Sequence, residues 1–350
     1  MLRFLLRRIR YSLLVLWGVV TLVFFLFNVL PGDPARLTMG QRSDLASVEA
    51  VRKELNLDKP LVTRYLFYLN DLSPLGVVKT DSSAAKVNAI GLITIGDHKK
   101  LALKQPYFGR SYRTKRSVGE VLGEALPGTI ILALAAMTIA TIGGIGLGII
   151  AALKKGTWLD TSAIAASVAG ISMPSFFAGL FIAYLFGYLL HNYTGLDMTG
   201  SLWEYDPFTG RHLALQHLVL PALALGIRPL AIITQLTRSA LLDVLSQDYI
   251  RTAYAKGLTK TRVVMRHALP NALNPVVTAI SGWLAELLAG SFFVEYIFGW
   301  KGVGKVTVDA LDKFDFPMVM GSVLLTAFIF IIVNLVTDML YGLLDPRVRL

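Results

Sequence analysis

The 350-residue chain contains no cysteine and few charged residues. Without cysteine it can form no disulfide, no cysteine-ligated zinc or iron–sulfur centre and no thiol nucleophile. Asp, Glu, Lys and Arg make up 16% of the residues, whereas a soluble domain has about 25%. Hydrophobic residues make up 54%. This balance excludes an ordinary soluble enzyme and predicts an integral membrane protein.

Charge and histidine spacing argue against two further classes. The chain holds 34 basic and 23 acidic residues, and this formal charge of +11 could by itself indicate a nucleic-acid partner. Nucleic-acid-binding domains are not this hydrophobic, so no nucleic-acid partner is expected. The five histidines show no metal-ligand spacing and no H-E-x-x-H motif, so we expect no metal site and no intramembrane hydrolase. His212 and His217, five residues apart, are expected to be solvated.

Six stretches are long and apolar enough to cross a membrane as helices. A spanning helix needs about 20 mostly apolar residues, because every backbone polar group must be satisfied inside the helix. The stretches are residues 9–30, 127–153, 161–190, 218–242, 275–297 and 318–344. The first follows four arginines like a secretory signal, but it exceeds the usual apolar region of about 7–15 residues and no A-x-A cleavage site follows. We therefore predict an all-α integral membrane protein with six transmembrane helices, the first retained as an anchor.

The distribution of lysine and arginine predicts the orientation. Short cytoplasmic loops carry an excess of these residues. Basic residues outnumber acidic ones in one set of segments, namely residues 1–10, 154–155, 238–271 and the tail after 345, and acidic residues outnumber basic ones in the short loops 191–217 and 295–317. The long segment 31–117 is also basic, but loops beyond about 60 residues are translocated largely regardless of charge. Both termini are predicted to be cytoplasmic.

Three regions follow from this topology. Residues 1–30 form the cytoplasmic N-terminus and first span, residues 31–117 form a large extracytoplasmic loop, and residues 118–350 form the core transmembrane domain. In the outer loop, helical spacing over 47–57 and an aromatic run at 65–68 predict a small helical cap. Residues 73–106 show no clear period and are interpreted as loop.

The cytoplasmic loop between the fourth and fifth spans, residues 239–271, is the most informative segment. A helical run over 249–256 stops at Gly257, a residue suited to a left-handed helix terminus. A second, basic amphipathic run over 260–269 ends at Pro270. We expect two short helices lying across the membrane face. They offer either a docking surface for a cytoplasmic partner or an interfacial element whose cations bind anionic lipid.

This loop resembles the EAA loop of ABC importer permeases, in particular the dipeptide, oligopeptide and nickel branch. The signature E-A-A-x3-G-x9-I-x-L-P falls on Arg251, Thr252, Ala253, Gly257, His267, Leu269 and Pro270, with Arg251, Thr252 and His267 in place of Glu, Ala and Ile, as that branch commonly allows. Five further motifs match the family in order: LPGDPA at 30–35, LNLDKP at 55–60 with FGRS at 108–111, SMPSFF at 172–177, YIFGWKGVG at 296–304 and LDPR at 344–347. The stretch near 73–106 departs from the family and looks inserted.

The resemblance implies a type I ABC importer transmembrane domain in the bacterial cytoplasmic membrane, surrounded by membrane lipid. A second, similar permease, two cytoplasmic ATPases and an extracytoplasmic solute-binding protein would be its partners. ATP and Mg would bind to the ATPases, so the chain itself would hold no cofactor and would not be an enzyme. The substrate would be a di- or oligopeptide, with nickel chelates, glutathione or peptide-like compounds as alternatives. The implied ATPase-coupling residues are Tyr249, Arg251, Thr252, Ala253, Lys256, Gly257, Arg266, His267, Leu269 and Pro270.

Two other classes fit less well. An ion-coupled secondary carrier would have inverted repeats and paired acidic or broken-helix sites near the midplane, and the sequence shows neither. A structural membrane scaffold would leave the two-helix cytoplasmic loop without a purpose.

Three local patterns are interpreted as structural. The run GWKGVGK at 299–305 fits the first part of a phosphate-binding loop, but Val306 stands where Ser or Thr should hold magnesium and no parallel strand precedes it. We therefore expect a tight outer turn. The GxxxG pattern of Gly144 and Gly148 predicts close helix packing, more often within the subunit than between subunits. Prolines that could kink spans stand at Pro174, Pro221 and Pro229.

Arg228 and Glu286 are unusual because they are ionised residues inside predicted spans. Such a charge costs about 2.5–3.5 kcal/mol at the bilayer centre, so each needs a partner or water. From the rise of a helix, both lie roughly 20 Å from the cytoplasmic ends of their spans. Our hypothesis is that they face the translocation path or each other. The alternative is that Arg228 extends outward to the membrane surface.

Overall fold

The computed structural model describes residues 2–29, 57–79, 89–94, 99–206 and 210–344, together with residues 49, 52 and 208. The chain divides into two compact units. One comprises Met1–Leu5, Ala125–Lys305 and Ile329–Leu350, and the other comprises Leu6–Glu124 and Val306–Phe328. Most described residues are helical, which confirms the all-α class, and the strands lie in the segments predicted to be extracytoplasmic.

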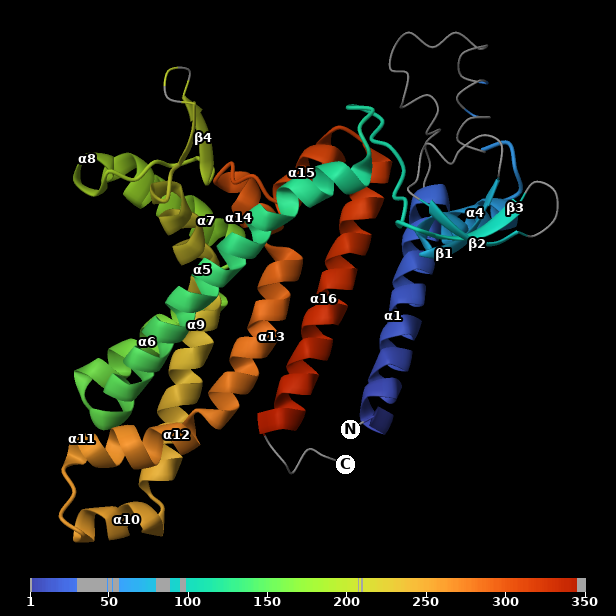
Figure 1. The fold of residues 1–350 in the computed structure, drawn as a ribbon. Coiled ribbons are helices and arrows are strands. Elements are labelled where there is room, and N and C mark those ends of the chain that lie inside the picture. The colour runs from blue at the N-terminus through green and yellow to red at the C-terminus, as the bar shows by residue number, and fades with distance from the viewer. Residues whose placement is uncertain are drawn as a thin grey trace. The chain divides into compact units, whose positions relative to one another are not determined.

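Four single helices are long and apolar enough to cross a membrane (Figure 1). They are α1 (Leu2–Val29), α5 (Val118–Leu153), α9 (Gln216–Leu245) and α16 (Phe316–Leu344). Two further pairs of helices pass the same test together but are bent, so the described residues contain six spans if each bent pair counts as one. The number six agrees with the sequence prediction on that count.

The first bent pair corresponds to the predicted third span. Helix α6 (Trp158–Ser172) is followed by α7 (Ser175–Ile182) and a π-helical segment (Ala183–Leu189), with an angle of 110° at the break. Pro174 explains the break, because proline lacks an N–H and disfavours helical backbone at the residue before it. Met173 accordingly has ψ 124°. The break therefore lies at the proline that the sequence identified as able to kink this span, and it is sharp enough to divide 161–190 into two helices.

The predicted fifth span is also divided. Helix α13 (Asn274–Gly290) is preceded by the short cytoplasmic helices at a 53° bend, and it ends before Ser291. Residues 292–297, which the sequence assigned to the same span, form a separate helix α14 (Phe292–Ile297), followed by α15 (Val303–Asp312). The prediction of one helix over 275–297 was therefore wrong at its outer end.

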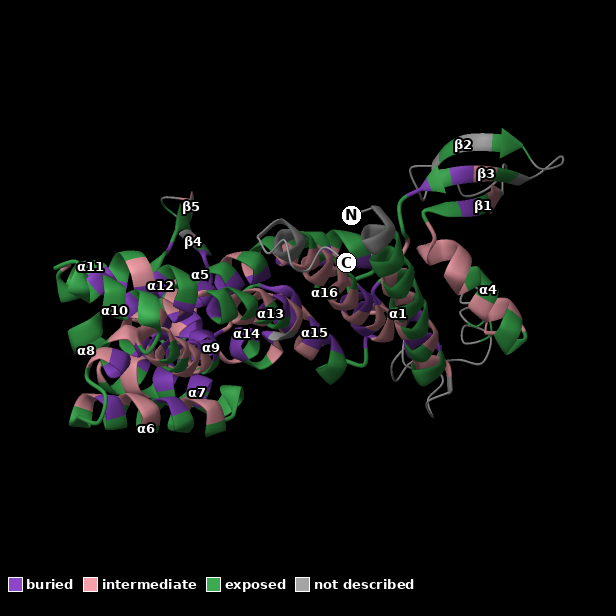
Figure 2. Ribbon diagram, turned by 90° about the horizontal axis from the view of Figure 1, so that it is seen from below, coloured by how far each residue is buried: buried purple, intermediate pink, exposed green. Residues whose placement is uncertain are grey.

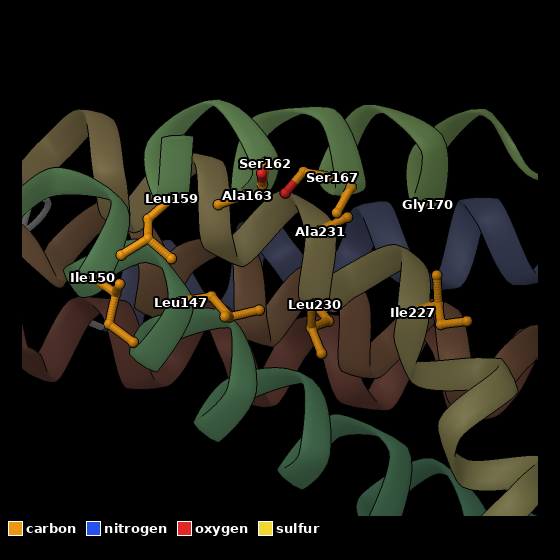
Figure 3. A pocket seen from close by; sticks show the side chains of 11 residues that line it. Leu147, Ile150, Leu159, Ser162, Ala163, Ser167, Gly170, Ile227, Leu230 and Ala231 are labelled. Carbon is orange, nitrogen blue, oxygen red and sulfur yellow. The ribbon is translucent and has the colours of Figure 1, made fainter. Parts of the chain in front are cut away.

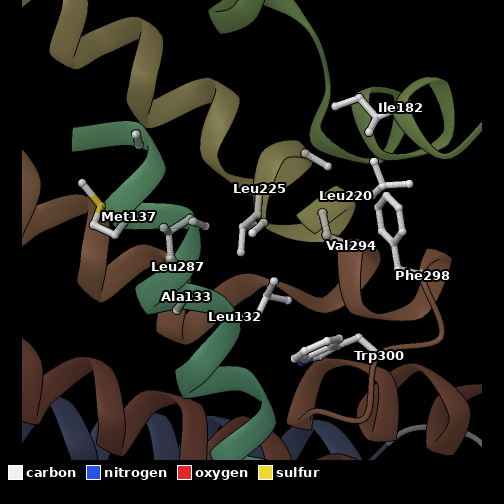
Figure 4. Packing of buried hydrophobic residues seen from close by; sticks show 14 of the residues in the cluster. Leu132, Ala133, Met137, Ile182, Leu220, Leu225, Leu287, Val294, Phe298 and Trp300 are labelled. Carbon is white, nitrogen blue, oxygen red and sulfur yellow. The ribbon is translucent and has the colours of Figure 1, made fainter. Parts of the chain in front are cut away.

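Helix α9 is the central element of the first unit. Of the residues in its most apolar stretch, 61% are buried inside the chain. Figure 2 shows buried residues gathered around α9, α14 and the facing side of α5. The core beside α9 (Figure 4) contains Leu132, Leu220, Phe298 and Trp300, each at most 2% exposed, and the Trp300 indole donates a 2.9 Å hydrogen bond to the Gly128 carbonyl.

Two glycines let α5 approach α9 closely. A Cβ on Gly144 would lie 2.7 Å from Cγ2 of Ile233, and one on Gly148 would lie 2.6 Å from Cβ of Thr237. Both distances are too short for a real side chain, so only glycine fits. The GxxxG pattern therefore packs helices within the subunit, as predicted. Pro221 and Pro229, in contrast, are accommodated inside a continuous α9.

The second unit contains the outer segment. Helix α4 (Leu61–Leu72) packs on α1 through aromatic contacts, and the Thr21 and Tyr65 hydroxyls are 2.6 Å apart. A three-stranded antiparallel sheet follows, with strand order β1 (Leu75–Lys79), β3 (Lys99–Lys104), β2 (Ala89–Thr94). The interpretation of 73–106 as loop was therefore wrong. The residues of β1 and β2 do not alternate regularly between apolar and polar, so the usual pattern of a strand is missing. The helix expected over 47–57 lies almost entirely outside the described residues.

Replacing Gly148 with Leu should destabilise the chain. The new side chain would have to enter the space of Thr237 and the Thr234 carbonyl, and overpacking of this kind costs about 1–3 kcal/mol. We expect a lower apparent melting temperature of the detergent-purified chain in a fluorescence size-exclusion assay.

The matched control is Gly146→Leu, two residues earlier on the same helix, where a Cβ would meet nothing within 4 Å. It should leave the melting temperature unchanged. Equal melting temperatures for both variants would contradict the close α5–α9 packing.

Candidate functional site

The cytoplasmic loop folds as two short helical segments, as predicted. Helix α10 (Asp248–Ala255) ends at Gly257, whose φ of +79° lies in the left-handed region that glycine tolerates. The second segment consists of α11 (Lys260–Val263), a π-helical turn and α12 (Leu269–Ala272). In Figure 1 these helices lie at the ends of α9 and α13 and at an angle to both.

The second segment continues past Pro270 instead of ending there. A π-helical turn over Val264–Ala268 precedes the proline, which occupies one of the first positions of α12. Proline there needs no hydrogen-bond acceptor one turn back, and the wider π turn avoids a clash with its ring. The predicted end of this helix at Pro270 was therefore wrong.

A small apolar core holds the two segments together. Ile250 and Ala253 of α10 pack with Val263, Val264 and Ala268 of the second segment, and the same cluster includes residues near the inner ends of α5 and α9. Two of the predicted coupling residues belong on this buried side, since Ala253 is 7% exposed and Leu269 is 9% exposed. Their side chains position the loop and are not available to a partner.

The outward side of the loop is cationic and aromatic. Most of the other predicted coupling residues are exposed and His267 is half-buried; the exposed ones are Tyr249, Arg251, Thr252, Lys256, Gly257, Arg266 and Pro270. Tyr254 and Met265 add exposed apolar area. Such a surface fits a partner that offers acidic groups around an apolar cleft.

One residue that joins the two segments escaped the sequence analysis. The Asn271 side chain donates hydrogen bonds to the Tyr249 hydroxyl at 3.0 Å and to the His267 carbonyl at 3.2 Å. It therefore links α10 to the end of α12. No local pattern distinguishes this asparagine, because its partner lies 22 residues away in the sequence.

A buried ion pair near the loop was also missed. Arg238 of α9 donates from Nη2 to Asp160 Oδ2 at 2.9 Å and from Nε to Oδ1, and the Gly156 N–H donates to the same carboxylate at 2.9 Å. The Asp160 side chain is 5% exposed and the Arg238 side chain 23%. The pair ties the turn between α5 and α6 to α9. From the sequence, Arg238 was considered only as one of the basic residues that indicate the cytoplasmic side.

Arg228 and Glu286 lie on the exposed sides of α9 and α13, two helices that pack against each other. Within the described residues no ion pair joins them. The guanidinium carbon of Arg228 lies 5.6 Å from the centre of the Trp283 ring, one helical turn from Glu286. Their predicted place on a translocation path remains a prediction.

An apolar groove of about 470 Å³ runs between α5, α6 and α9 (Figure 3). Its lining includes Leu147, Ile150, Leu159 and Leu230, and its side-chain oxygens come from Ser162 and Ser167. Because no charged side chain lines this groove, it offers nothing to neutralise the charges of a solute.

The glycine-rich run 299–305 surrounds a carboxylate of the chain itself. Glu295 is fully buried and accepts hydrogen bonds from the Thr129 hydroxyl at 2.8 Å and the Lys305 N–H at 3.1 Å. A Cβ on Gly302 would overlap its Oε2 atom, and one on Gly304 would lie 2.9 Å away. These glycines make room for Glu295, in agreement with the predicted tight turn.

His217 is buried, so the expectation that it is solvated was wrong. It is 6% exposed, and its Nε2 lies 3.0 Å from Asp197 and its Nδ1 3.2 Å from Glu204 of β4 (Trp203–Asp206). His212, on β5 (Gly210–Leu213), is half exposed and lies 3.5 Å from Glu204. Among the described residues no group of three or more ligands is placed to hold a metal ion.

The fold and the loop together define an integral membrane protein with several helical spans and a two-segment cytoplasmic loop. The profile of the binding-protein-dependent transport system inner membrane component matches residues 144–350, and the N-terminal profile of the same family matches residues 1–133. The chain belongs to this family. It is a multi-pass permease subunit of an ABC importer in the bacterial inner membrane.

Permeases of peptide and glutathione transport systems are similar to this chain over its full length. The di/tripeptide transport system permease DppB of Pseudomonas aeruginosa is 38% identical, with 100% of this chain and 99% of that protein covered. The dipeptide permease DppB of Escherichia coli K12 is 37% identical at the same coverage. The glutathione transport system permease GsiC of Shigella flexneri is 35% identical, again with 100% and 99% covered.

A solved structure supports the fold alone. An inward-facing form of the MetNI methionine ABC transporter aligns with a TM-score of 0.50 at 16% identity, covering 65% of this chain and 97% of that chain. This likeness agrees with the predicted importer transmembrane fold.

Removing the Asp160 charge should destabilise the inner end of the subunit. Asp160→Asn leaves the Arg238 guanidinium with a weaker partner in a largely buried place, and breaking such a pair is unfavourable. We expect a lower melting temperature, and partial recovery in the charge-swapped variant D160R/R238D.

Asp243→Asn is the matched control, because Asp243 is an exposed carboxylate near the same end of α9. It should behave like the wild type. If D160N and D243N melted alike, the ion pair would have no role in holding α6 to α9.

Proposed function

We propose that this chain is the membrane subunit through which an ATP-driven importer moves di- and oligopeptides. The observation that carries the proposal is the cytoplasmic loop, whose two helices have a buried core and a cationic outer side. Such an element can dock in a partner and move as a unit. The peptide substrate is supported by relatives of 37–38% identity over the full chain that are named as dipeptide or di/tripeptide permeases.

The proposed assembly contains a second, similar permease, two cytoplasmic ATPases and an extracytoplasmic solute-binding protein. ATP and Mg²⁺ are assigned to the ATPases, which carry out the hydrolysis, and this chain holds no cofactor. In the ATPases' clefts the exposed residues Tyr249, Arg251 and Arg266 would meet acidic and apolar groups. Ala253 and Leu269 act from the buried side by holding the loop in shape.

The mechanism follows from how the loop is attached. Closure of the ATPases displaces α10 and the second segment, their shared core passes the displacement to α5 and α9, and α12 leads directly into α13, so the spans move as rigid bodies. The Asp160–Arg238 pair extends this connection to α6. Alternate closure of the inner and outer sides then moves the peptide across the membrane.

A second substrate class has a specific observation in its favour. A relative named as a glutathione permease is 35% identical over the full chain. Glutathione is itself a peptide, so the same machinery serves both. Nickel chelates and other peptide-like compounds remain alternatives, and an ion-coupled secondary carrier is the alternative of another class.

Purification of the tagged chain from its native membrane tests the assembly. We expect a second permease and two ATPases to co-purify. Proteoliposomes of this complex should accumulate a dipeptide only with ATP and the solute-binding protein. Uptake by the chain alone, driven by an ion gradient without ATP, would overturn the proposal in favour of a secondary carrier.

Gly257→Leu tests the role of the loop. Non-glycine residues in the left-handed region cost about 1–2 kcal/mol, so the turn between the two segments should change shape. We expect normal membrane insertion but a loss of ATPase docking, measured as the yield of co-purified ATPase.

The matched control is Gly195→Leu. Gly195 also has a positive φ, +66°, with open space around it, but it lies in the predicted outer loop. This variant should have the same backbone strain, but the yield of co-purified ATPase should stay at the wild-type level. Equal yields of co-purified ATPase from the two variants would show that the loop is not part of the docking surface.

A further inference from the structure

Arg228 and Glu286 carry charges of opposite sign on two neighbouring, mostly apolar helices, yet they are not paired with each other. Both side chains are exposed, and neither takes part in an ion pair or hydrogen bond within the described residues. Asp160 and Arg238, in contrast, bond each other directly. Unneutralised charges in a membrane span are costly, so such residues are retained for a ligand or a partner.

The two charges lie on the same surface. The Arg228 guanidinium lies over the Trp283 ring, with its carbon 5.6 Å from the ring centre. Glu286 follows Trp283 by three residues on α13, and residues three apart share a helix face. Trp283 therefore lies against the Arg228 guanidinium and one helical turn before Glu286 on the same helix.

The face of α13 that carries Glu286 is polar or small along its length. Exposed polar or small residues recur every fourth position at Asn274, Thr278, Gly282 and Glu286, and the helix also exposes Pro275 and Val277 near its start. Each step of four residues stays on the neighbouring turn but rotates by about 40°, so these residues form a stripe that winds around the helix. A lipid-facing helix side would carry large apolar residues, so this stripe indicates contact with a solute, water or another polar surface.

We propose that Arg228 and Glu286 bind the two charged ends of a zwitterionic peptide as it passes through the membrane. The Arg228 guanidinium receives the C-terminal carboxylate as a planar, two-pronged donor, and the Glu286 carboxylate accepts hydrogen bonds from the N-terminal ammonium group. Trp283 holds the guanidinium in place through its ring face.

The chemistry of this surface selects for peptides. All unmodified peptides share one carboxylate and one ammonium group, whereas their side chains differ. One charge of each sign matches this common feature, and the small residues Gly282 and Thr278 leave space for different side chains. This assignment rests on the proposed function, and it goes further by naming the substrate-contacting residues.

The first test compares peptides with free and blocked ends. The complete importer is reconstituted in proteoliposomes with its solute-binding protein preloaded to equal occupancy with Ala-Phe, N-acetyl-Ala-Phe or Ala-Phe-amide. Wild type should carry the free peptide about tenfold faster than either blocked one, because each block leaves one charge of the membrane span without its partner.

Each variant should lose the discrimination against one of the two blocked peptides and keep the other. Glu286→Gln should carry the free and acetylated peptides at similar rates while still rejecting the amide. Arg228→Gln should show the reverse pattern, so each variant is the control for the other. If both variants kept the wild-type discrimination, the assignment would be wrong. If wild type carried no peptide at all, the proposed function itself would fail.

The second test uses the absence of cysteine from the chain, which makes single-cysteine variants specific. In the complete importer, Arg228→Cys and Glu286→Cys should react with a membrane-impermeant thiol reagent, and excess Ala-Phe with ATP and the loaded binding protein should slow the reaction. Ile142→Cys, at a position of α5 that is 71% exposed and apolar, should stay unlabelled.

The competing explanation is that the second permease covers Arg228 and Glu286 in the complete importer. The labelling experiment distinguishes this explanation from peptide binding. If the cysteines at 228 and 286 reacted in the isolated chain but not in the complete importer, with or without peptide, the two charges would belong to a subunit interface. That result would overturn the assignment even if the variants still folded.

Discussion

The need to satisfy backbone hydrogen bonds inside the bilayer controls the rest of this structure. The spans are helices because a helix pairs every backbone N–H and C=O group within a single segment. The departures from regular helix therefore mark places with another role: Pro174 bends the third span by 110°, and the π turn before Pro270 lets the cytoplasmic segment continue into α12. Glycines at 144 and 148 then bring α5 against α9 at a distance that larger side chains would prevent.

The cytoplasmic loop has two distinct sides. Its apolar side chains face inward and join it to α5 and α9, while its cations and aromatic residues face outward. Because one core joins both segments, the proposed docking of a partner on the outer side would act on the loop as one body.

Charges near the membrane have three different roles in this chain. Asp160 and Arg238 are buried against each other and hold helices together. Glu295 is buried among donors of its own chain and orders the glycine-rich outer turn. Arg228 and Glu286 are exposed and form no ion pair with the residues that the structure describes, which is the basis for the proposed contact with a substrate. Residue type is similar in all three cases, and only the surroundings decide the role.

Composition and local patterns were sufficient to predict the helical membrane class, the two-helix loop with its first helix stopping at Gly257, and the close packing at the GxxxG pattern, because the signal for each lies in residues close together in the sequence. Burial of His217, the Asn271 link and the Asp160–Arg238 pair could not be predicted, because their partners lie 13 to 78 residues away or on other elements. The short strands near residues 75–104 give too little alternation to identify. Local patterns determine which segments are helices, whereas long-range packing decides which charges are paired and which remain free to bind.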